Sequence, residues 1–393
     1  MALTNIAAVA DALKSFYLEG LRYQLNSAAD PLLAQIERDS ESVVGTEIVM
    51  ALRYGRSGGV GNRADDGDLP TPNSRKTKQA KWQTKNLFAR IQLTDKIIEA
   101  SKSSRGAFAN LLEQDLEDAL TDAKDNLSRQ VYGDGKGVLA SCTDAVNVAT
   151  ITVDTVQYLA EGMLVDIASS TGVAITNGTG REITAVDEVA KTFTVSGTAD
   201  LSPSSSNVYV SGNYNLELTG LAAIFTTNNT IYGIDRSANK WFNPGSQAIN
   251  GEISEVAIQQ AIDDAERKAG GNINYLACSY GVRRAYQNLL TAQKQIINSI
   301  DLKGGWKALS YTGGKGQIPI MAGKYAPVQK LRALDLSNWK MYEMNDWTWL
   351  DRDGAVLSRV SGKAAWEATL AKYCDLGCDK PKGQVDLTGI TEH

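Results

Sequence analysis

The sequence predicts an α+β fold made of several compact units, and three observations support this prediction. Apolar residues recur with a helical period over residues 105–132, whereas apolar and polar residues alternate over residues 143–215. A long irregular stretch also separates two strand-like runs within residues 46–94. The chain has 393 residues, which is more than one ordinary hydrophobic core accommodates, so two or three units are expected.

The composition limits the classes of protein to which the chain can belong. Hydrophobic residues make up 43% of the sequence, which is normal for a folded protein, and the formal net charge is −5. This charge disfavours a protein that grips nucleic acid through phosphates, but it allows a container that encloses nucleic acid loosely. No apolar run reaches the roughly 20 residues of a membrane span, and residues 1–5 lack the positive charge of a secretory signal. We therefore expect no membrane association, and synthesis in the cytoplasm.

The first element is a helical segment over residues 5–37, which Pro31 divides into two parts. The pattern fits an ordinary surface helix, and it also fits an arm that docks on another molecule. The arm is favoured because no compact unit follows it directly. Its apolar residues at steps of three and four are Leu13, Phe16, Tyr17, Leu21 and Leu25.

The second element is a two-stranded excursion, in which residues 47–54 leave and residues 82–93 return. The connection between them is glycine-rich and carries a short acidic run at residues 65–68. An irregular connection of this length within a compact domain usually marks function or mobility. The second half has no acidic residue from Leu69 to Thr94, and its basic residues are Arg75, Lys76, Lys78, Lys81, Lys85 and Arg90.

The third element is a helix over residues 105–132, which we expect Ser103 or Ser104 to cap and Gly133 to end. At 1.5 Å per residue it spans on the order of 40 Å, longer than most globular helices. Its polar side is acidic and carries Glu113, Asp115, Glu117, Asp118, Asp122 and Asp125.

The rest of the chain is expected to alternate between β-rich and mixed segments. Residues 143–215 predict a small all-β module inserted between two α/β parts. Mixed structure follows over 216–335, with a helix over 253–269 that ends at Gly270 and a buried strand that leads into a helix capped by Ser279. From residue 336 onward short strands dominate.

The search for catalytic or cofactor sites gives no candidate. The only histidine, His393, is at what we expect to be a frayed chain end, which excludes a Ser-His-Asp or Cys-His site. Of the four cysteines only Cys374 and Cys378 are close in sequence, and zinc would need two further ligands. The glycine-rich runs at 133–137 and 313–316 lack the spacing or context of a nucleotide loop, and the acidic run fails as a calcium loop. We predict no enzyme, no metal and no cofactor.

The basic stretch allows three interpretations. Because it includes Trp82 and Phe88, it could stack on single-stranded nucleic acid, it could be a solvated strand face, or it could contact an acidic surface. The third interpretation is favoured, since the acidic helix over residues 105–132 offers such a surface in another copy of this chain. The predicted contact residues between subunits are Arg75, Lys76, Lys78, Lys81, Lys85, Arg90, Glu113, Glu117, Asp118 and Asp122.

The order of these parts resembles the major capsid proteins of tailed bacteriophages, whose fold is shared with encapsulin shells. Four segments also look like this family at residue level, and their order and spacing cover nearly the whole chain. They are Leu52–Gly61, Arg90–Thr94, Arg129–Gly135 and Tyr373–Cys378, the last followed by Gly383-Gln384-Val385. The inserted β module departs from the minimal fold of the family.

The resemblance implies an arm, an extended loop, a peripheral domain with a spine helix, and an axial domain. The implied ranges are 1–44 for the arm, 45–94 for the extended loop, 95–142 and 336–393 for the peripheral domain, 143–215 for the β module, and 216–335 for the axial domain.

The resemblance also implies a self-assembling structural protein. Its copies would form the hexamers and pentamers of an icosahedral head that encloses double-stranded DNA without sequence-specific binding, assembled in the host cytoplasm and found in the virion. Expected partners are a separate scaffolding protein, since the arm begins within a few residues of Met1, a portal, and optionally a decoration protein. The alternatives are an encapsulin-like nanocompartment shell and, less favoured, a β-rich enzyme or a carbohydrate-binding protein.

Overall fold

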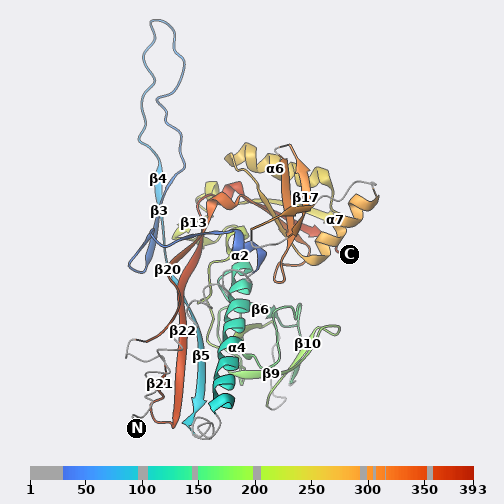
Figure 1. Ribbon diagram of the computed structural model, residues 1–393. Coiled ribbons are helices and arrows are strands. Elements are labelled where there is room, and N and C mark those ends of the chain that lie inside the picture. Colours follow the sequence, from blue (N-terminus) through green and yellow to red (C-terminus); the bar gives the residue numbers. More distant parts are fainter. Residues whose placement is uncertain are drawn as a thin grey trace.

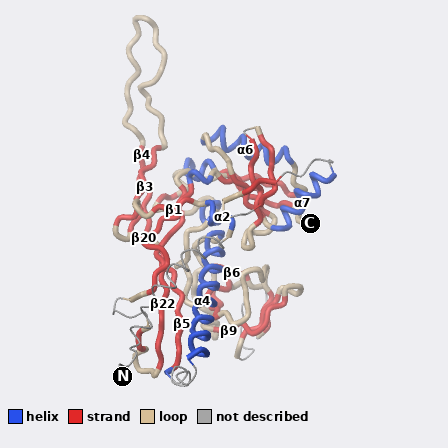
Figure 2. Tube along the Cα trace, in the orientation of Figure 1, coloured by secondary structure: helices blue, strands red, loops and turns tan. Residues whose placement is uncertain are grey.

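The computed structural model describes residues 30–95, 105–143, 149–197, 205–292, 299–303, 307–314, 316–351 and 357–393. Strands dominate it, and they form separate sheets around three hydrophobic clusters (Figures 1 and 2). The predicted helix over residues 5–29 and the predicted cap at Ser103 or Ser104 lie outside the described residues.

A long sheet and the long helix α4 (Arg105–Tyr132) form the lower part of Figure 1. In the sheet, β22 (Ala365–Cys378) lies between β5 (Lys85–Thr94) and β20 (Trp339–Trp349), with β1 (Glu37–Asp39) beside β20 and the short β21 (Ser358–Arg359) also on β22. Leu87 and Leu93 of β5 are buried in one cluster with Leu120 and Leu127 of α4. The apolar stripe of the helix therefore covers one face of this sheet, and the helix ends at Tyr132 as predicted.

The extended hairpin pairs β3 (Glu47–Arg53) with β4 (Thr77–Gln83), and β2 (Val43–Val44) lies on the other side of β3. The predicted return strand, residues 82–93, is therefore wrong. The chain leaves the hairpin at Thr84, whose N–H donates to the carbonyl of Thr46, and β5 then joins the long sheet instead. The inward-facing residues change from even positions, Ala80 and Trp82, to odd positions, Leu87 and Leu93, across the polar run 83–86, so the sequence pattern does carry a sign of this break.

The upper right part of Figure 1 is a seven-stranded sheet flanked by α6 (Glu255–Ala269) and α7 (Tyr280–Ala292). Gly270 adopts a left-handed conformation and ends α6, and the N–H of Val282 donates to the Ser279 hydroxyl at 3.2 Å, so both predicted ends are confirmed. The strand order is β14 (Gly245–Gly251), β23 (Val385–Ile390), β19 (Lys330–Leu334), β15 (Tyr275–Cys278), β18 (Gly316–Ala322), β17 (Lys307–Gly313) and β16 (Ser299–Asp301).

The position of β23 corrects the prediction that residues 336–393 form one unit. Its carbonyls and N–H groups pair with β14 and β19, so the last described strand belongs to the seven-stranded sheet and not to the long one. Its first three residues, Val385, Asp386 and Leu387, are all buried, which is typical of a strand with both faces covered.

A six-stranded sheet lies beside α4 and forms the third cluster. Its edge strand β6 (Val138–Ser141) falls in the range predicted for the peripheral domain, so the sheet starts earlier than expected. The Asn215 N–H donates to the Lys136 carbonyl at 3.0 Å, so the chain enters and leaves this β sheet at one place. The strand order is β6, β11 (Asn207–Val210), β8 (Leu164–Ala168), β9 (Arg181–Asp187), β10 (Thr192–Val195) and β7 (Thr150–Thr152).

Short elements connect these parts. Gly220 opens α5 and lies against the end of α4, where a Cβ atom would be 2.4 Å from the Gln130 carbonyl oxygen, so only glycine fits. The connecting elements are α2 (Pro31–Gln35), α5 (Leu221–Phe225), β12 (Thr230–Ile231), β13 (Ile234–Asp235), and the 3₁₀ turns η1 (Lys240–Phe242), η2 (Leu336–Asn338) and η3 (Pro381–Gly383).

Two expectations at the chain ends are corrected. Residues 37–39 form strand β1 instead of continuing a helix, because the Glu37–Asp39 backbone pairs in parallel with β20. His393 is not frayed, since its ring nitrogen lies 3.0 Å from Glu252 and its carbonyl accepts a hydrogen bond from Arg284.

Candidate assembly interface

The extended hairpin projects away from the rest of the chain, and its irregular tip reaches beyond the other elements (Figure 1). The base is fixed by aromatic contacts. Tyr54 stacks on Trp241 with ring centroids 4.7 Å apart, and Trp82 lies 4.1 Å from the ring of Tyr232. Residues 54–76 beyond this base are mostly exposed. A rigid base and an exposed tip suit a contact with another molecule.

Four of the predicted basic contact residues lie on this hairpin. Arg75, Lys76 and Lys78 are exposed. Lys78 Nζ donates to Asn239 Oδ1 at 3.2 Å, and Lys81 Nζ lies 2.7 Å from Glu47 on the paired strand. The last two contacts keep these lysines near the base of the hairpin, while Arg75 and Lys76 lie nearer its tip.

The structure does not bring Lys85 and Arg90 together with the other four. Both lie on β5, where Lys85 Nζ donates to the Asn215 carbonyl at 3.1 Å and Arg90 forms an ion pair with Glu367 of β22. The expected continuous basic strand is thus divided between two sheets. Moreover, β5 packs on the α4 helix of its own chain.

The predicted acidic residues lie on α4. Glu113, Glu117 and Asp118 are helical, but their side chains are outside the described part of the chain. Asp122 is exposed on the same helix. The proposed contact between this acidic helix and the hairpin of another copy stays a prediction.

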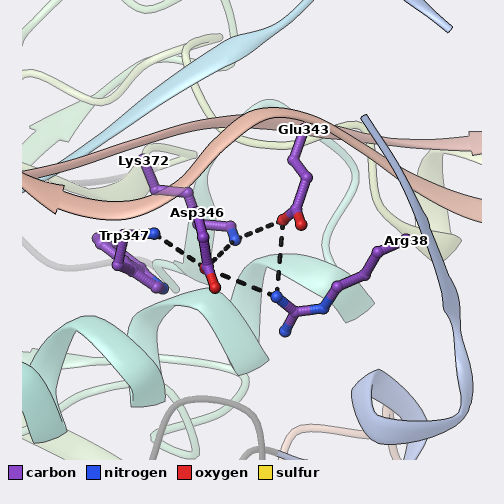
Figure 3. Close-up of polar contacts among 5 residues, drawn as sticks. All are labelled: Arg38, Glu343, Asp346, Trp347 and Lys372. Atoms are coloured by element: carbon purple, nitrogen blue, oxygen red, sulfur yellow. Dashed lines mark hydrogen bonds and ion pairs between the residues drawn. The ribbon is translucent and has the colours of Figure 1, made fainter. Parts of the chain in front are cut away.

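A buried ionic network holds β1 on the long sheet, and no sequence signal pointed to it. Lys372 of β22 is 1% exposed, and its Nζ lies 2.6 Å from Glu343 Oε2 and 3.0 Å from Asp346 Oδ1 (Figure 3). Arg38 of β1 approaches the same two carboxylates at 3.7 and 3.6 Å. Two cations and two carboxylates balance each other, which is what burial of charge requires.

The electrostatics of the network favour the ionised form of Asp346. Burial would raise the pKa of Asp346, but the charge of Lys372, its hydrogen bond and the Trp347 N–H, which donates at 2.9 Å, together bring this pKa below its ordinary value. A second ion pair, Lys340 to Asp39 at 3.3 Å, also ties β1 to β20. The network therefore acts as a clamp on residues 37–39, where the N-terminal segment joins the sheet.

Two buried carboxyl groups link other segments. Asp375 of β22 is fully buried and accepts hydrogen bonds from the Thr219 N–H at 2.7 Å and the Thr219 hydroxyl at 3.0 Å. Asp30 accepts from the Tyr132 hydroxyl and the Leu32 N–H, both at 2.9 Å. Burial raises the pKa of Asp375 to about 7 and that of Asp30 to about 6, because a buried charge loses its hydration.

Side-chain chemistry elsewhere is limited. The four cysteines are free and buried, and burial raises the pKa of Cys142, Cys278 and Cys374 to about 12. Within the described residues, no three His, Cys, Asp or Glu side chains gather as metal ligands would. Among the same residues, no helix combines the length and apolarity needed to cross a membrane.

Comparisons with known proteins agree with the predicted resemblance. Residues 204–355 match the family model of the SU10 major capsid protein. The capsid asymmetric unit of cyanophage A-1(L) is similar with a TM-score of 0.56 and 14% identity, over 94% of this chain and 93% of that chain. No curated protein sequence matches the chain.

Two further solved structures are similar at lower scores. The capsid of an empty GTA particle has a TM-score of 0.48 and 11% identity, over 93% of this chain and 90% of that chain. The SrpI encapsulin of Synechococcus elongatus PCC 7942 has a TM-score of 0.45 and 8% identity, over 91% and 86%. The likeness to the cyanophage subunit confirms the predicted α+β capsid fold, and the family model confirms the resemblance to phage major capsid proteins.

Proposed function

We infer that this chain, a phage capsid shell protein by its family match and its fold, assembles into the hexamers and pentamers of an icosahedral head. The observation that supports this most directly is the capsid fold over nearly the whole chain, with a hairpin that projects far beyond the chain's own core. A projection of this kind gains packing only from a neighbouring molecule. Rings built from such heterologous contacts close when the rotation between copies is correct.

The head encloses double-stranded DNA and needs no base-reading site, in keeping with the net charge of −5. Its other partners are a separate scaffolding protein, a portal and, in some particles, a decoration protein. The protein is made and assembled in the host cytoplasm and is found in the virion. An encapsulin-like shell with a protein cargo is the second candidate, and the family match to a phage capsid protein favours the first.

Electron microscopy of particles formed by the purified protein tests this function. We expect closed shells of uniform diameter, and nuclease-protected double-stranded DNA in particles isolated from infected cells. A protein that stays monomeric at high concentration, with scaffolding protein present, would exclude a shell function. Particles that hold a protein cargo and no DNA would support the encapsulin-like alternative.

We also propose that the hairpin contacts helix α4 of an adjacent copy. Its exposed basic residues, Arg75, Lys76 and Lys78, face the acidic surface of α4 in an adjacent copy, around Glu113, Glu117 and Asp118. Support comes from the opposite charges of the two surfaces and from the distance by which the hairpin leaves its own chain (Figure 1). Lys81 belongs to the same hairpin surface, whereas Lys85 and Arg90 do not take part, because both lie on β5 of the long sheet and not on the hairpin.

A further inference from the structure

Beyond its base, the two arms of the extended hairpin lie side by side without forming a ladder. The last main-chain bond between them runs from the Tyr54 N–H to the Lys76 carbonyl at 3.1 Å, and Figure 2 draws the arms beyond it as loops. Contact between the arms continues, since a Cβ atom added at Gly59 would lie 3.3 Å from the Cα atom of Pro72. Within the described residues, Gly67 in the turn at the tip has the one N–H of residues 55–75 that donates to a main-chain carbonyl.

Two prolines in the return arm explain why the ladder stops. Proline has no N–H, and Pro70 and Pro72 are two positions apart, so both lack a donor toward the same edge of the arm. At the base of the hairpin the even-numbered residues direct their main-chain groups at the partner strand, as the bond between Tyr54 and Lys76 shows. Continued along the arm, this alternation places both prolines on the inner edge. The inner ladder therefore loses two successive donors.

The outer edge of the return arm keeps its donors. The same alternation turns the N–H and carbonyl groups of Thr71, Asn73 and Arg75 away from the other arm, and all three residues are exposed. No main-chain carbonyl in the described part of the chain accepts a hydrogen bond from these three N–H groups. An extended segment with unpaired main-chain groups along one edge is a template on which another strand can pair.

Charge complementarity indicates which molecule supplies this strand. The return arm is basic at Arg75 and Lys76, whereas α4, the proposed neighbour of the hairpin in an adjacent copy, has an acidic side. The arm also projects away from the core of its own chain (Figure 1). We propose that the outer edge of residues 71–75 pairs through main-chain hydrogen bonds with an extended segment of that adjacent copy. This inference rests on the proposed function and adds main-chain pairing to the contact between side-chain charges.

Proline and alanine variants of the full-length protein distinguish main-chain from side-chain contacts. Thr71→Pro with Asn73→Pro removes two outer N–H groups, whereas Thr71→Ala with Asn73→Ala removes only the side chains. We expect the double proline variant to assemble about tenfold more slowly than wild type in light scattering, and the double alanine variant to stay within roughly twofold. Ser74→Pro is the matched control, because its N–H lies on the inner edge, and it should assemble as wild type does. Melting temperatures equal to that of wild type show that the variants fold.

Hydrogen exchange of the wild-type protein tests the same bonds without a substitution. The amides of residues 71–75 should exchange about tenfold more slowly in assembled shells than in unassembled subunits. Equal exchange in the two states, protection that requires a different protein, normal assembly of the double proline variant, or an equal defect in Ser74→Pro would overturn the inference and leave the proposed function intact. A wild-type protein that forms no shells would refute the proposed function, and this inference with it.

Discussion

Individual buried charges in this protein lie where separate segments of the chain meet. Lys372 shares two carboxylates with the more exposed Arg38 of β1 and so joins β1 to the long sheet. Asp375 joins β22 to the segment that leaves the β module, and Asp30 joins α2 to the end of α4. A buried charge needs partners that an unfolded or displaced segment does not provide. These residues therefore specify how the segments dock, more than they add to stability.

The first prediction concerns Asp375 and pH. Its folded pKa of about 7 is above the ordinary value of 3.8, so the folded protein holds a proton that the unfolded chain releases. Its contribution to stability is present below pH 4 and is lost as the pH rises to about 7. Asp375→Asn should keep the three hydrogen bonds, with its amide donating to Thr219, and remove this loss. We expect the variant to gain on the order of 2–4 kcal/mol over wild type at pH 8, and almost nothing at pH 4.

Urea unfolding from pH 4 to 8 measures this difference. Asp375→Ala is the matched control, because it removes the acceptors for the Thr219 and Leu376 N–H groups and should destabilise the protein at every pH. A pH-independent difference between Asp375→Asn and wild type would show that the carboxyl group does not titrate in this range.

The second prediction concerns the clamp on β1. Lys372→Met leaves Glu343 and Asp346 with Arg38 as their remaining cation, and should lower the free energy of unfolding by about 3–5 kcal/mol. Adding Glu343→Gln removes the surplus negative charge and should recover part of this loss. Chemical denaturation of both variants gives the two values. A double variant as unstable as the single one would mean that lost packing, and not charge, causes the effect.

At the scale of single elements, we expect the hairpin to contact a neighbouring copy through its exposed charges. Lys78→Glu with Lys81→Glu should weaken assembly, and Glu117→Lys with Asp118→Lys should partly restore it. Each exposed ion pair contributes only about 0.2–1 kcal/mol, but the contact repeats in every copy of the shell. Light scattering during assembly measures the effect. It should diminish between 0.15 and 1 M salt, as the screening length falls from about 8 to 3 Å.

A control is needed because Lys81 also pairs with Glu47 inside the hairpin. Glu47→Lys added to the lysine double variant restores this internal pair without touching α4. If that change alone restores assembly, the loss arose within the hairpin and the contact between copies is refuted.

Elements with local signals could be predicted from the sequence, whereas their partners could not. Ser279 and Gly270 mark helix ends through contacts within a few residues, and both predictions are confirmed. At Thr84 the inward-facing residues change from even to odd positions, which indicates an interruption, but the carbonyl that fixes the break lies 38 positions earlier and the new partner of β5 lies near the end of the described chain. The burial of Lys372 likewise depends on Arg38, Glu343 and Asp346 from other strands, so a lysine in a strand pattern gave no sign of it.

For the whole molecule, the β module offers a test of which parts form the lattice. The two ends of the module meet where the Asn215 N–H donates a hydrogen bond to the Lys136 carbonyl. A short Gly-Ser linker can therefore replace residues 137–214 without moving the flanking chain. We expect the shortened protein to fold and to form shells of normal diameter in electron micrographs. Its melting temperature should fall by a few degrees, because Gln157 and Tyr158 no longer bond the carbonyls of Lys324 and Tyr325. Failure of a folded variant to assemble would place the module in the lattice.

Assembly should also proceed without a metal or a nucleotide. Dialysis against a chelator before assembly should change neither the rate nor the yield of shells, since we find no cluster of metal ligands in the described residues. Sedimentation velocity with and without the chelator measures this. If shells formed only after a divalent cation was added, the prediction would be wrong, and a metal site formed between copies would be required.

The place of β23 governs when a newly made chain becomes usable. Residues 385–390 lie between the edge strand β14 and β19 in the seven-stranded sheet, so β14 has no strand to pair with until they have left the ribosome. Nascent chains on one polysome, crowded together and able to meet, therefore lack a finished seven-stranded sheet. A ribosome that stops early likewise releases a chain without β23. We therefore expect incomplete chains to be excluded from assembly.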